Sequence, residues 1–429
     1  MDNENRVVIT GLGVVAPNGV GKDRFLEALQ NGESGAARIE ELDEFMEAGG
    51  MAAFPKFEGE DSAFMRRFKL RKLQSTGILY GCMAGVEAWE DAGLSIAPKD
   101  ALEPDWDSGC IMGGGITGIE SIDYGIKMAD VGKMKKVGPR NIQQSMSSAP
   151  SAYLGGMLGL GNQVTSNSSA CATGTEALLM AYHRIKGGRA KRMLAGGCDS
   201  RLKYIWASFD VMRVLNRNPD IDPVKASRPL SASAAGFLPG AGGGALVVES
   251  LESAQARGAR IYAELLGGST NSGGQRGQGS ITAPSNVGIV RCIQDMIKET
   301  GVTADQIDLI SGHLTGTAIG DPTEIKSWVE ALNRRGEDFP YVNSLKSMIG
   351  HCLSAAGAVE SVGAVLQIYH DFVHPTLNCE DLHPDIADKV STNRIPQECI
   401  YDAGINVLAK ASFGFGDVNT CLILKKWTK

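Results

Sequence analysis

A chain of 429 residues is too long for one small hydrophobic core and predicts about two or three domains. The hydrophobic share of 43% and the charged share of 21% are those of a globular protein, and a formal net charge of −7 argues against a nucleic-acid-binding protein. No apolar run approaches the roughly 20 residues of a membrane span, so the sequence predicts neither a span nor a secretory signal.

Nine cysteines are scattered singly along the chain, without a CxxC pair or the spacing of metal ligands. An odd number of cysteines without a framework is typical of reduced thiols. The sequence therefore predicts a cytoplasmic protein without disulfides and without a metal site.

In the first part of the chain, short apolar runs alternate with amphipathic segments. The predicted strands are Arg6–Val15, Gly109–Gly118, a strand ending at Val164 and Thr165, Arg192–Cys198 and Ala245–Val248. The predicted helices are Lys22–Asn31, Ser75–Ala92, Glu176–Lys186 and Leu251–Gly258. Residues 35–62 are predicted to be irregular.

From Ile261 the opening pattern, a strand that runs into a glycine turn, is repeated. The predicted elements that follow are helices at Ser285–Thr300, Pro322–Ala331 and Ala355–His370 and strands at Ile307–Ser311 and Asn406–Phe413. Strands that alternate with helices predict an α/β protein. The repeated pattern suggests an internal duplication, with one half at residues 1–255 and a second at residues 256–429.

Cys171 lies between a strand end and a helix, among small residues that leave room for a substrate. The unpaired N–H groups at a helix start favour a thiolate, which is the nucleophilic form of cysteine. By residue type alone, a buried cysteine that packs as a small hydrophobic side chain is the more common case. The setting nevertheless favours Cys171 as a nucleophile.

Two of the six histidines follow or precede runs of small residues. His313 comes just after the strand at 307–311, and His351 comes just before the helix that contains Ala355–Glu360. Histidines at strand ends and helix starts are often catalytic, although a lone histidine is more often structural. Together with Cys171 they form a set that activated-thiol chemistry could use.

Four separated motifs carry a family resemblance. They are SACATGTEAL at 169–178, HLTGTAIGDPTE at 313–324, KSMIGHCLSAAGAVE at 346–360 and SFGFGDVN at 412–419. In this order, and over nearly the whole chain, the sequence resembles the elongating β-ketoacyl-acyl-carrier-protein synthases. The resemblance implies a thiolase-like fold of five αβαβα layers, made of two similar α/β halves with mixed sheets.

The resemblance also implies a reaction, in which an acyl chain is held on Cys171 while His313 and His351 handle a malonyl group. A decarboxylative Claisen condensation then gives a β-ketoacyl-carrier product in fatty-acid or related polyene or polyketide synthesis. Lys346 and Glu360 match a pair that supports the histidines, and Glu324 is a further candidate. A plain ion-pair network is the alternative for these three residues and does not exclude the first role.

Other positions match the family's binding elements. The backbone N–H groups of Cys171 and Phe415 match the oxyanion hole, and Thr315 and Thr317 match the threonines that bind the pantetheine arm. The acyl pocket and its gate correspond to Ile116, Phe413, Gly414, Phe415 and Gly416. As single residues, the phenylalanines and the isoleucine would be assigned to the core.

The resemblance implies an acyl carrier protein as partner, in its acyl and malonyl forms. No cofactor of the enzyme's own is implied, because phosphopantetheine arrives on the carrier. Carriers are acidic, so basic residues near the family's contact positions become candidates for a docking patch: Arg71, Lys72, Arg140 and Arg213. A solvated helix face is the simpler reading of such charges. The resemblance further implies a homodimer, or a heterodimer with a related subunit.

The chain departs from the family pattern at several positions. Leu314 and Asp417 stand where glycine is usual, and four usually charged positions are neutral together: Ser231, Ala234, Ala235 and Ala241. We expect these four to represent one polar network replaced as a unit, because removing every partner of a buried network costs less than removing one.

Two other functions are possible. A non-catalytic partner of the chain-length-factor type usually lacks the cysteine, so Cys171 argues against it. A thiolase-like enzyme acting on coenzyme A esters is disfavoured by His351 and by the basic residues.

Overall fold

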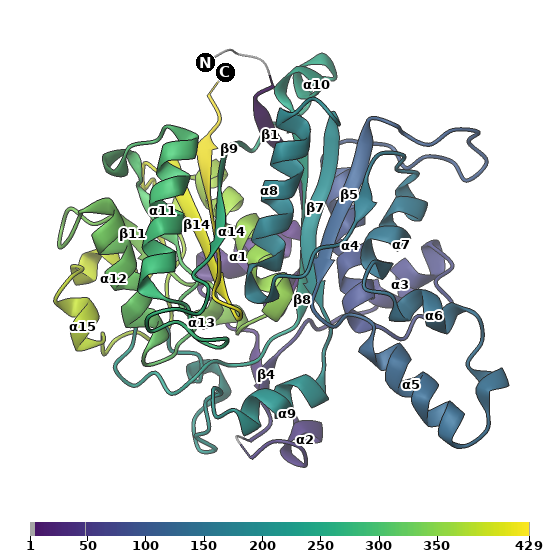
Figure 1. Cartoon of the computed structure of the whole chain (residues 1–429), viewed down its shortest axis with the longest axis horizontal. Helices are drawn as coiled ribbons and strands as arrows, with labels where there is room; N and C mark the ends of the chain where they lie inside the picture. Colours follow the sequence, from purple (N-terminus) through teal and green to yellow (C-terminus); the bar gives the residue numbers. More distant parts are fainter. Residues whose placement is uncertain (1–4, 48, 429) are drawn as a thin grey trace.

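The computed structural model describes residues 5–47 and 49–428, which are built around one mixed sheet (Figure 1). β1 (Val7–Ala16) lies in its middle, and all ten residues of this strand are buried. Such a strand is covered by helices on both faces. β1 pairs antiparallel with β8 (Gly242–Ser250) on one side and with β9 (Ala263–Ser272) on the other.

The strand order is repeated on either side of the β1–β9 contact. From β1 outward the sheet continues through β8, β7 (Arg192–Asp199), β5 (Ser108–Gly114) and β6 (Val164–Thr165). From β9 outward it continues through β15 (Val418–Lys426), β14 (Val407–Gly414), β10 (Leu309–Ser311) and β11 (Tyr341–Asn343). On each side the two inner junctions are antiparallel and the two outer ones parallel. The boundary near residue 255 stays a prediction.

Two mixed sheets were expected, but the ladder is continuous. β1 and β9 pair through Val8 opposite Glu264 and Ile9 opposite Ala263. These two residue pairs join both halves of the sheet, because β1 pairs with β8, and β9 with β15, along the opposite edge of each strand.

Helices complete the layers. α4 (Thr76–Asp91) packs on β1, β8 and β7, and α11 (Asn286–Thr300) packs on β9 and β15. α8 (Thr173–Lys186) and α14 (Ala356–His370) contact each other and lie between the two halves of the sheet, as Figure 1 shows. The α/β class and the five-layer order are therefore confirmed.

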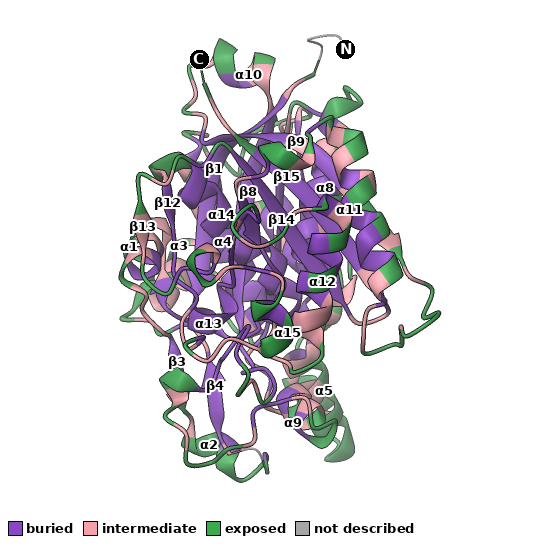
Figure 2. Cartoon of the chain, turned by 90° about the vertical axis from the view of Figure 1, so that its left-hand side faces the viewer, coloured by how far each residue is buried: buried purple, intermediate pink, exposed green. Residues whose placement is uncertain are grey.

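α14 lies in the innermost layer. Its residues 356–368 are all buried, and Figure 2 shows the helix enclosed by the strands. A helix that is apolar nearly all round is a core helix. Glu360 has the one carboxylate on this buried surface, so its charge needs ion-pair or hydrogen-bond partners inside the protein.

The prediction that residues 35–62 are irregular was wrong. The segment contains β3 (Ala36–Arg38), α2 (Glu40–Asp43), β4 (Met51–Ala53) and the start of α3 (Glu60–Arg67), and β3 pairs with β4. These elements are too short to show a hydrophobic period in the sequence.

Several further elements had no predicted counterpart. They are the helices α5 (Ile119–Asp130), α6 (Arg140–Ser145), α7 (Ala149–Leu158) and α9 (Lys203–Val211) and the inner strand β15. Among the described residues, no helix combines the length and the hydropathy needed to cross a bilayer.

Candidate active site

The turn that carries Cys171 joins β6 to α8. Residues Ala170–Ala172 form a 3-10 turn, so Cys171 lies two positions before the first residue of α8. Ala170 has a φ of 49°, a strained conformation for a residue with a side chain. Thr173 holds the turn: its hydroxyl accepts a hydrogen bond from the Ser169 N–H at 2.8 Å and donates one to the Ala170 carbonyl at 2.7 Å.

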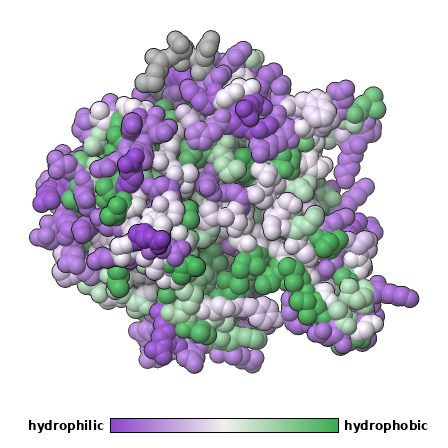
Figure 3. All heavy atoms as spheres, viewed as in Figure 1, coloured by the Kyte–Doolittle hydropathy of each residue, from purple (hydrophilic) through white to green (hydrophobic). Residues whose placement is uncertain are grey.

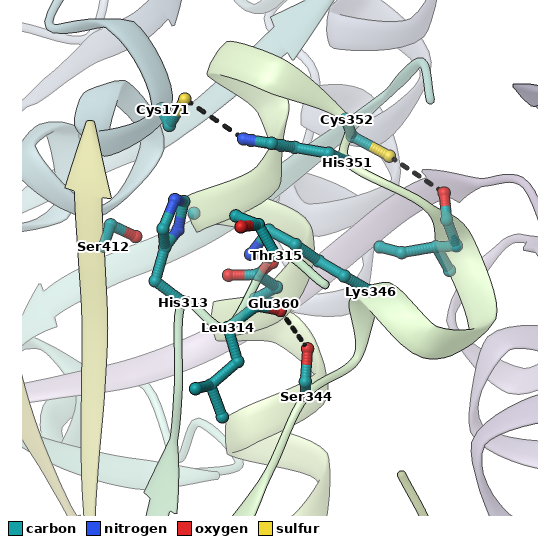
Figure 4. A network of polar contacts seen from close by, with 12 residues as sticks. Cys171, His313, Leu314, Thr315, Ser344, Lys346, His351, Cys352, Glu360 and Ser412 are labelled. Carbon is teal, nitrogen blue, oxygen red and sulfur yellow. Dashed lines mark hydrogen bonds and ion pairs between the residues drawn. The ribbon is translucent and has the colours of Figure 1, made fainter. Parts of the chain in front are cut away.

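His351 lies against the thiol. Its Nε2 is 3.1 Å from the Cys171 Sγ (Figure 4). Its Nδ1 accepts a hydrogen bond from the Leu353 backbone N–H at 3.1 Å. Because Nδ1 is an acceptor in that bond, the proton of the neutral ring resides on Nε2, which faces the cavity side of the ring.

His313 follows β10 and is positioned through its backbone. The Glu324 carboxylate, on α12 (Gly320–Leu332), accepts hydrogen bonds from the N–H groups of His313 at 2.8 Å and of Leu314 at 2.7 Å. Leu314 has a φ of 23°, so it occupies a conformation that favours glycine. The carboxylate and the burial of the leucine side chain in the core hold this strained backbone in place.

The structure brings Cys171, His313 and His351 together. The two imidazole rings have centroids 5.3 Å apart at an interplanar angle of 81°. The nitrogen and sulfur atoms that could act as ligands all lie within 4.8 Å of one another. One thiol and two imidazoles could also hold a metal ion such as zinc. The spacing of these residues along the sequence does not match a known metal-binding motif.

Burial determines the protonation of these groups. It raises the pKa of the Cys171 thiol to about 11, and the Lys346 ammonium and the Phe415 N–H offset only part of this increase. Burial therefore opposes the thiolate that the helix start is expected to favour. Burial also lowers the pKa of both histidines well below 6.5, and the nearby lysines lower it further. At neutral pH the site consists of a thiol and two neutral imidazoles.

Lys346 and Glu360 are paired as predicted, but they are not alone. Lys346, on α13 (Lys346–Ile349), forms a buried ion pair with one oxygen of Glu360. The other oxygen lies 2.8 Å from the ammonium of Lys410, which is fully buried on β14. Sequence reasoning missed Lys410. The available signal was a single lysine inside the otherwise apolar strand VLAKASF.

A cavity of about 560 Å³ opens beside the sulfur. Most of the predicted binding residues line it: Ile116, Thr315, Thr317, Phe413, Gly414 and Phe415. The hydroxyl oxygens of Thr315 and Thr317 are 3.1 Å apart. Gly416 is not part of the lining and lies in the turn that follows, with a φ of 90°.

A chain of aromatic rings connects the histidine to the predicted gate. The ring of Phe237 lies 5.3 Å from that of His351, the ring of Phe209 lies 5.4 Å from that of Phe237, and the ring of Phe415 lies 6.0 Å from that of Phe209. Phe209 and Phe237 also line the cavity. Sequence reasoning missed both, because a single phenylalanine in a helix or loop cannot be distinguished from a core residue.

The end of β14 reaches the backbone of Cys171. A Cβ added to Gly414 would lie 3.0 Å from the Cys171 nitrogen and 3.2 Å from the Ser169 carbonyl oxygen, so a side chain here would need its neighbours to move by a few tenths of an ångström. The Phe415 backbone N–H contacts the Cys171 sulfur. The two residues whose N–H groups are predicted to form an oxyanion hole are therefore in contact.

Three of the four predicted carrier-binding residues line one surface depression of about 520 Å³: Arg71, Lys72 and Arg140. Lys136 lies there too, and Arg140 donates a hydrogen bond to the Arg71 carbonyl at 2.9 Å. Arg213 is not part of this depression. It follows α9 and precedes Val214, which lines the catalytic cavity.

The four neutral positions do not share one environment. Ser231 is buried and bonded to Asp381, which also accepts from Arg228 at 2.9 Å. Ala241 is buried, whereas Ala235 is exposed. The expectation of a single replaced network is therefore wrong, because a charge at an exposed position needs no buried partner.

Comparisons with known proteins agree along the whole chain. The profile of the β-ketoacyl synthase N-terminal domain matches residues 4–254, and that of the C-terminal domain matches residues 262–380. The chain is 33% identical to the 3-oxoacyl-[acyl-carrier-protein] synthase 2 of Vibrio cholerae, over 99% of this chain and 100% of that protein. It is 35% identical to the enzyme of the same name from Rhizobium meliloti, over 99% of both chains.

Solved structures show the same likeness. A β-ketoacyl synthase from Burkholderia phymatum superposes with a TM-score of 0.86 at 28% identity, and covers 99% of this chain and 100% of that one. A type II polyketide ketosynthase, solved in complex with its acyl-carrier protein, superposes with a TM-score of 0.84 at 28% identity and the same coverage. The ishigamide ketosynthase/chain length factor superposes with a TM-score of 0.84 at 29% identity.

Proposed function

Because the chain belongs to the β-ketoacyl synthase family, we propose that it condenses an acyl chain with malonyl-acyl carrier protein, with loss of carbon dioxide. The observation that carries this proposal is the contact of a cysteine thiol with a neutral imidazole, beside a second imidazole, in one apolar cavity. The enzyme is an acyltransferase without a cofactor of its own, because the phosphopantetheine belongs to the carrier.

In the first half-reaction, Cys171 takes the acyl group from the carrier thioester. The new C–S bond forms at the carbonyl carbon, the bond to the pantetheine sulfur breaks, and the thiol proton of Cys171 ends on the released pantetheine thiol. The Nε2–H of His351 faces the sulfur and stabilises the negative charge that develops on it. We assign the oxyanion hole to the N–H groups of Cys171 and Phe415, which the approach of Gly414 to Cys171 and the contact of the Phe415 N–H with the sulfur support.

In the second half-reaction, the malonyl C–C bond breaks, carbon dioxide leaves, and the electron pair moves onto the thioester as an enolate. Neutral Nε2–H donors on His313 and His351 stabilise the enolate oxygen. The enolate carbon then attacks the acyl group on Cys171. The sulfur leaves and takes up one proton, and the product is a β-ketoacyl chain that is two carbons longer.

The cavity lining supports further roles. Thr315 and Thr317 offer hydroxyl groups to the pantetheine arm, and Ile116 narrows the apolar part of the cavity. Phe413 is buried beside His313, while Phe415 is half-buried at the end of the aromatic chain. We assign the gate to Phe415 and its flanking Gly414 and Gly416. The basic depression at Arg71, Lys72 and Arg140 is the proposed dock for the acidic carrier.

The surface supports a dimer, either with a second copy or with a related subunit. Apolar residues on and after α5 and α6 are each at least 42% exposed: Ile122, Ile126, Val131, Met134, Ile142 and Met146. Figure 3 shows apolar residues gathered across the lower middle of the molecule, between the regions of α9 and α5. β6 ends the sheet and leaves one strand edge without a partner among the described residues.

A reducing compartment such as the cytoplasm suits the nine free cysteines.

A non-catalytic chain-length factor is disfavoured by the intact thiol–imidazole pair. The test is to incubate the protein with an acyl-carrier and weigh the Cys171 peptide. We expect one acyl group on Cys171, none in Cys171→Ala, and full loading in Cys399→Ala, a half-buried cysteine outside the site. A folded protein that takes up no acyl group would overturn the proposal. Acetyl-coenzyme A, offered in place of malonyl-carrier, tests the thiolase alternative.

The histidines are tested separately by the release of carbon dioxide from malonyl-carrier. His351→Ala should slow this release by about 100-fold, the usual effect of losing one donor to a developing oxyanion. Cys171→Gln should abolish condensation but still release carbon dioxide. Near-normal release by His351→Ala would exclude the histidine from this step.

A further inference from the structure

A fully buried lysine beside the catalytic groups has no role in the reaction described so far. Lys410 lies on β14 with none of its surface exposed. Lysine is almost never fully buried unless it is paired. Its ammonium lies 2.8 Å from Glu360 Oε2, and it also donates to the Ala411 carbonyl and, at 3.3 Å, to the Ser412 hydroxyl.

Glu360 is shared between two lysines. Lys346 occupies its Oε1 and Lys410 its Oε2. One carboxylate between two ammonium groups leaves a surplus positive charge in a site from which water is excluded, where charges act strongly. Glu324 is a further carboxylate that acts on Lys410, but its oxygens already accept the His313 and Leu314 N–H groups, and burial raises its pKa to about 7.

The ion pairs of Glu360 with Lys346 and Lys410 connect the segments that contain the proposed catalytic residues. Lys346 begins the short helix α13 that leads to His351, and Glu360 belongs to the central helix α14. Lys410 belongs to β14, whose end approaches Cys171. Figure 4 shows Lys346 and Glu360 beneath the two histidines, on the side away from the sulfur.

We propose that Lys410 is a positioning residue of the decarboxylation step, completing a buried lysine–glutamate–lysine bridge that keeps positive charge behind His313 and His351 and so maintains them as neutral donors. This inference deepens the proposed function and rests on it. The charge of Lys410 opposes protonation of both imidazoles, and burial and Lys346 act in the same direction. His351 must stay neutral, since a proton on Nδ1 would break the bond from the Leu353 N–H.

Lys410 is expected to affect one half-reaction only. The charges that act on the Cys171 thiol come from Lys346, Glu360 and Asp199, and Lys410 is not among its principal influences. The titratable and charged groups around the imidazoles come from six elements: Cys171 before α8, Asp199 on β7, Asp321 and Glu324 on α12, Lys346 on α13, Glu360 on α14 and Lys410 on β14.

The experiment compares Lys410→Met, Lys410→Arg and, as control, Lys425→Met, which removes an exposed lysine from β15. Lys410→Met leaves a balanced Lys346–Glu360 pair, so we expect it to fold. At pH 7 both imidazoles stay neutral in this variant, so its carbon dioxide release from malonyl-carrier should stay near the wild-type rate. The acid limb of the pH profile should move up by about one unit, because the histidines protonate more readily. Acyl loading of Cys171 should be unchanged.

Lys410→Arg should keep the wild-type profile, and so should Lys425→Met. An unmoved acid limb in Lys410→Met would overturn the inference. Equal losses in acyl loading and decarboxylation would also overturn it, since they would show a purely structural role. Should Lys410→Met not fold, Lys410→Gln, which keeps a hydrogen-bond donor without the charge, must show the same shift. An inactive wild-type protein would instead refute the proposed function itself.

Discussion

At the scale of single residues, burial and the start of helix α8 act in opposite directions on Cys171, the proposed nucleophile. Cys171 lies two residues before α8 and contacts a neutral imidazole, yet burial raises its pKa to about 11. A thiolate in an apolar cavity lacks the hydration it would have in water. In the proposed reaction the thiolate forms as the substrate carbonyl arrives, when the proposed oxyanion donors and His351 can share the charge.

This protonation state can be measured by alkylation. Iodoacetamide reacts with the thiolate, so the alkylation rate of Cys171 should rise about tenfold per pH unit between pH 7 and 10, without a plateau near pH 8. The readout is the mass of the Cys171 peptide over time, with the half-buried Cys399 peptide as internal comparison. A plateau at or below pH 8 would show that the helix start, not burial, controls this thiol.

At the scale of elements, the turn between β14 and β15 is tied to the segment opposite it. Asp417, buried at a φ of 60°, accepts hydrogen bonds from the N–H groups of Gln275 and Ser285, each at 2.9 Å. The Gly416 N–H bonds to the Ile281 carbonyl at 2.7 Å. Because residues 282–284 line the catalytic cavity, this carboxylate fixes one wall of the cavity to the loop of Phe415.

Asp417→Ala should lower the free energy of unfolding by about 1–3 kcal/mol, since the buried Ser285 N–H and the part-buried Gln275 N–H lose their acceptor. Asp417→Gly loses the same acceptor but relieves the left-handed backbone, so it should be about 1 kcal/mol more stable than Asp417→Ala. Urea denaturation measures both differences. Asp402→Ala, at an exposed aspartate with a φ of 50°, controls for the backbone conformation alone. Equal stability of Asp417→Ala and wild type would contradict the inference that the Asp417 carboxylate holds this turn to the segment opposite it.

At the scale of the whole molecule, charge is distributed unevenly. The chain carries a net charge of −7, yet basic side chains gather in one depression beside α6. A local basic surface on an acidic protein can attract an acidic partner while the rest of the surface repels it, and this attraction weakens as salt screens it.

Arg71→Glu should therefore raise the KM for malonyl-carrier by about tenfold at low salt and flatten the dependence of KM on ionic strength. The value of kcat should be preserved, because Arg71 lies on the surface and does not line the catalytic cavity. Steady-state kinetics at two salt concentrations measure both parameters. Lys425→Glu, the same charge change on β15, is the matched control. An equal rise in KM in both variants would contradict binding of the carrier protein at this depression.

Much of the fold and site could be predicted from local patterns. The strands β1, β7 and β14 and the helices α4, α11 and α14 have continuous hydrophobic patterns, so their sequences indicate them. The short elements between residues 36 and 67 have no room for such a pattern. Cys171, His313 and His351 could be selected because each lies among small residues at the end of a strand or the start of a helix.

The sequence by itself determined which residues are the candidates for the chemistry, and also the alternation of strands and helices, because both follow from short contiguous stretches. Only the tertiary structure decided the protonation of Cys171 and the histidines and the partnership of Lys410 with Glu360. Burial depends on every layer that covers a group, and the bridge joins residues 346, 360 and 410 from three separate elements. No local pattern contains that information, since it arises when the two halves of the sheet close around α8 and α14.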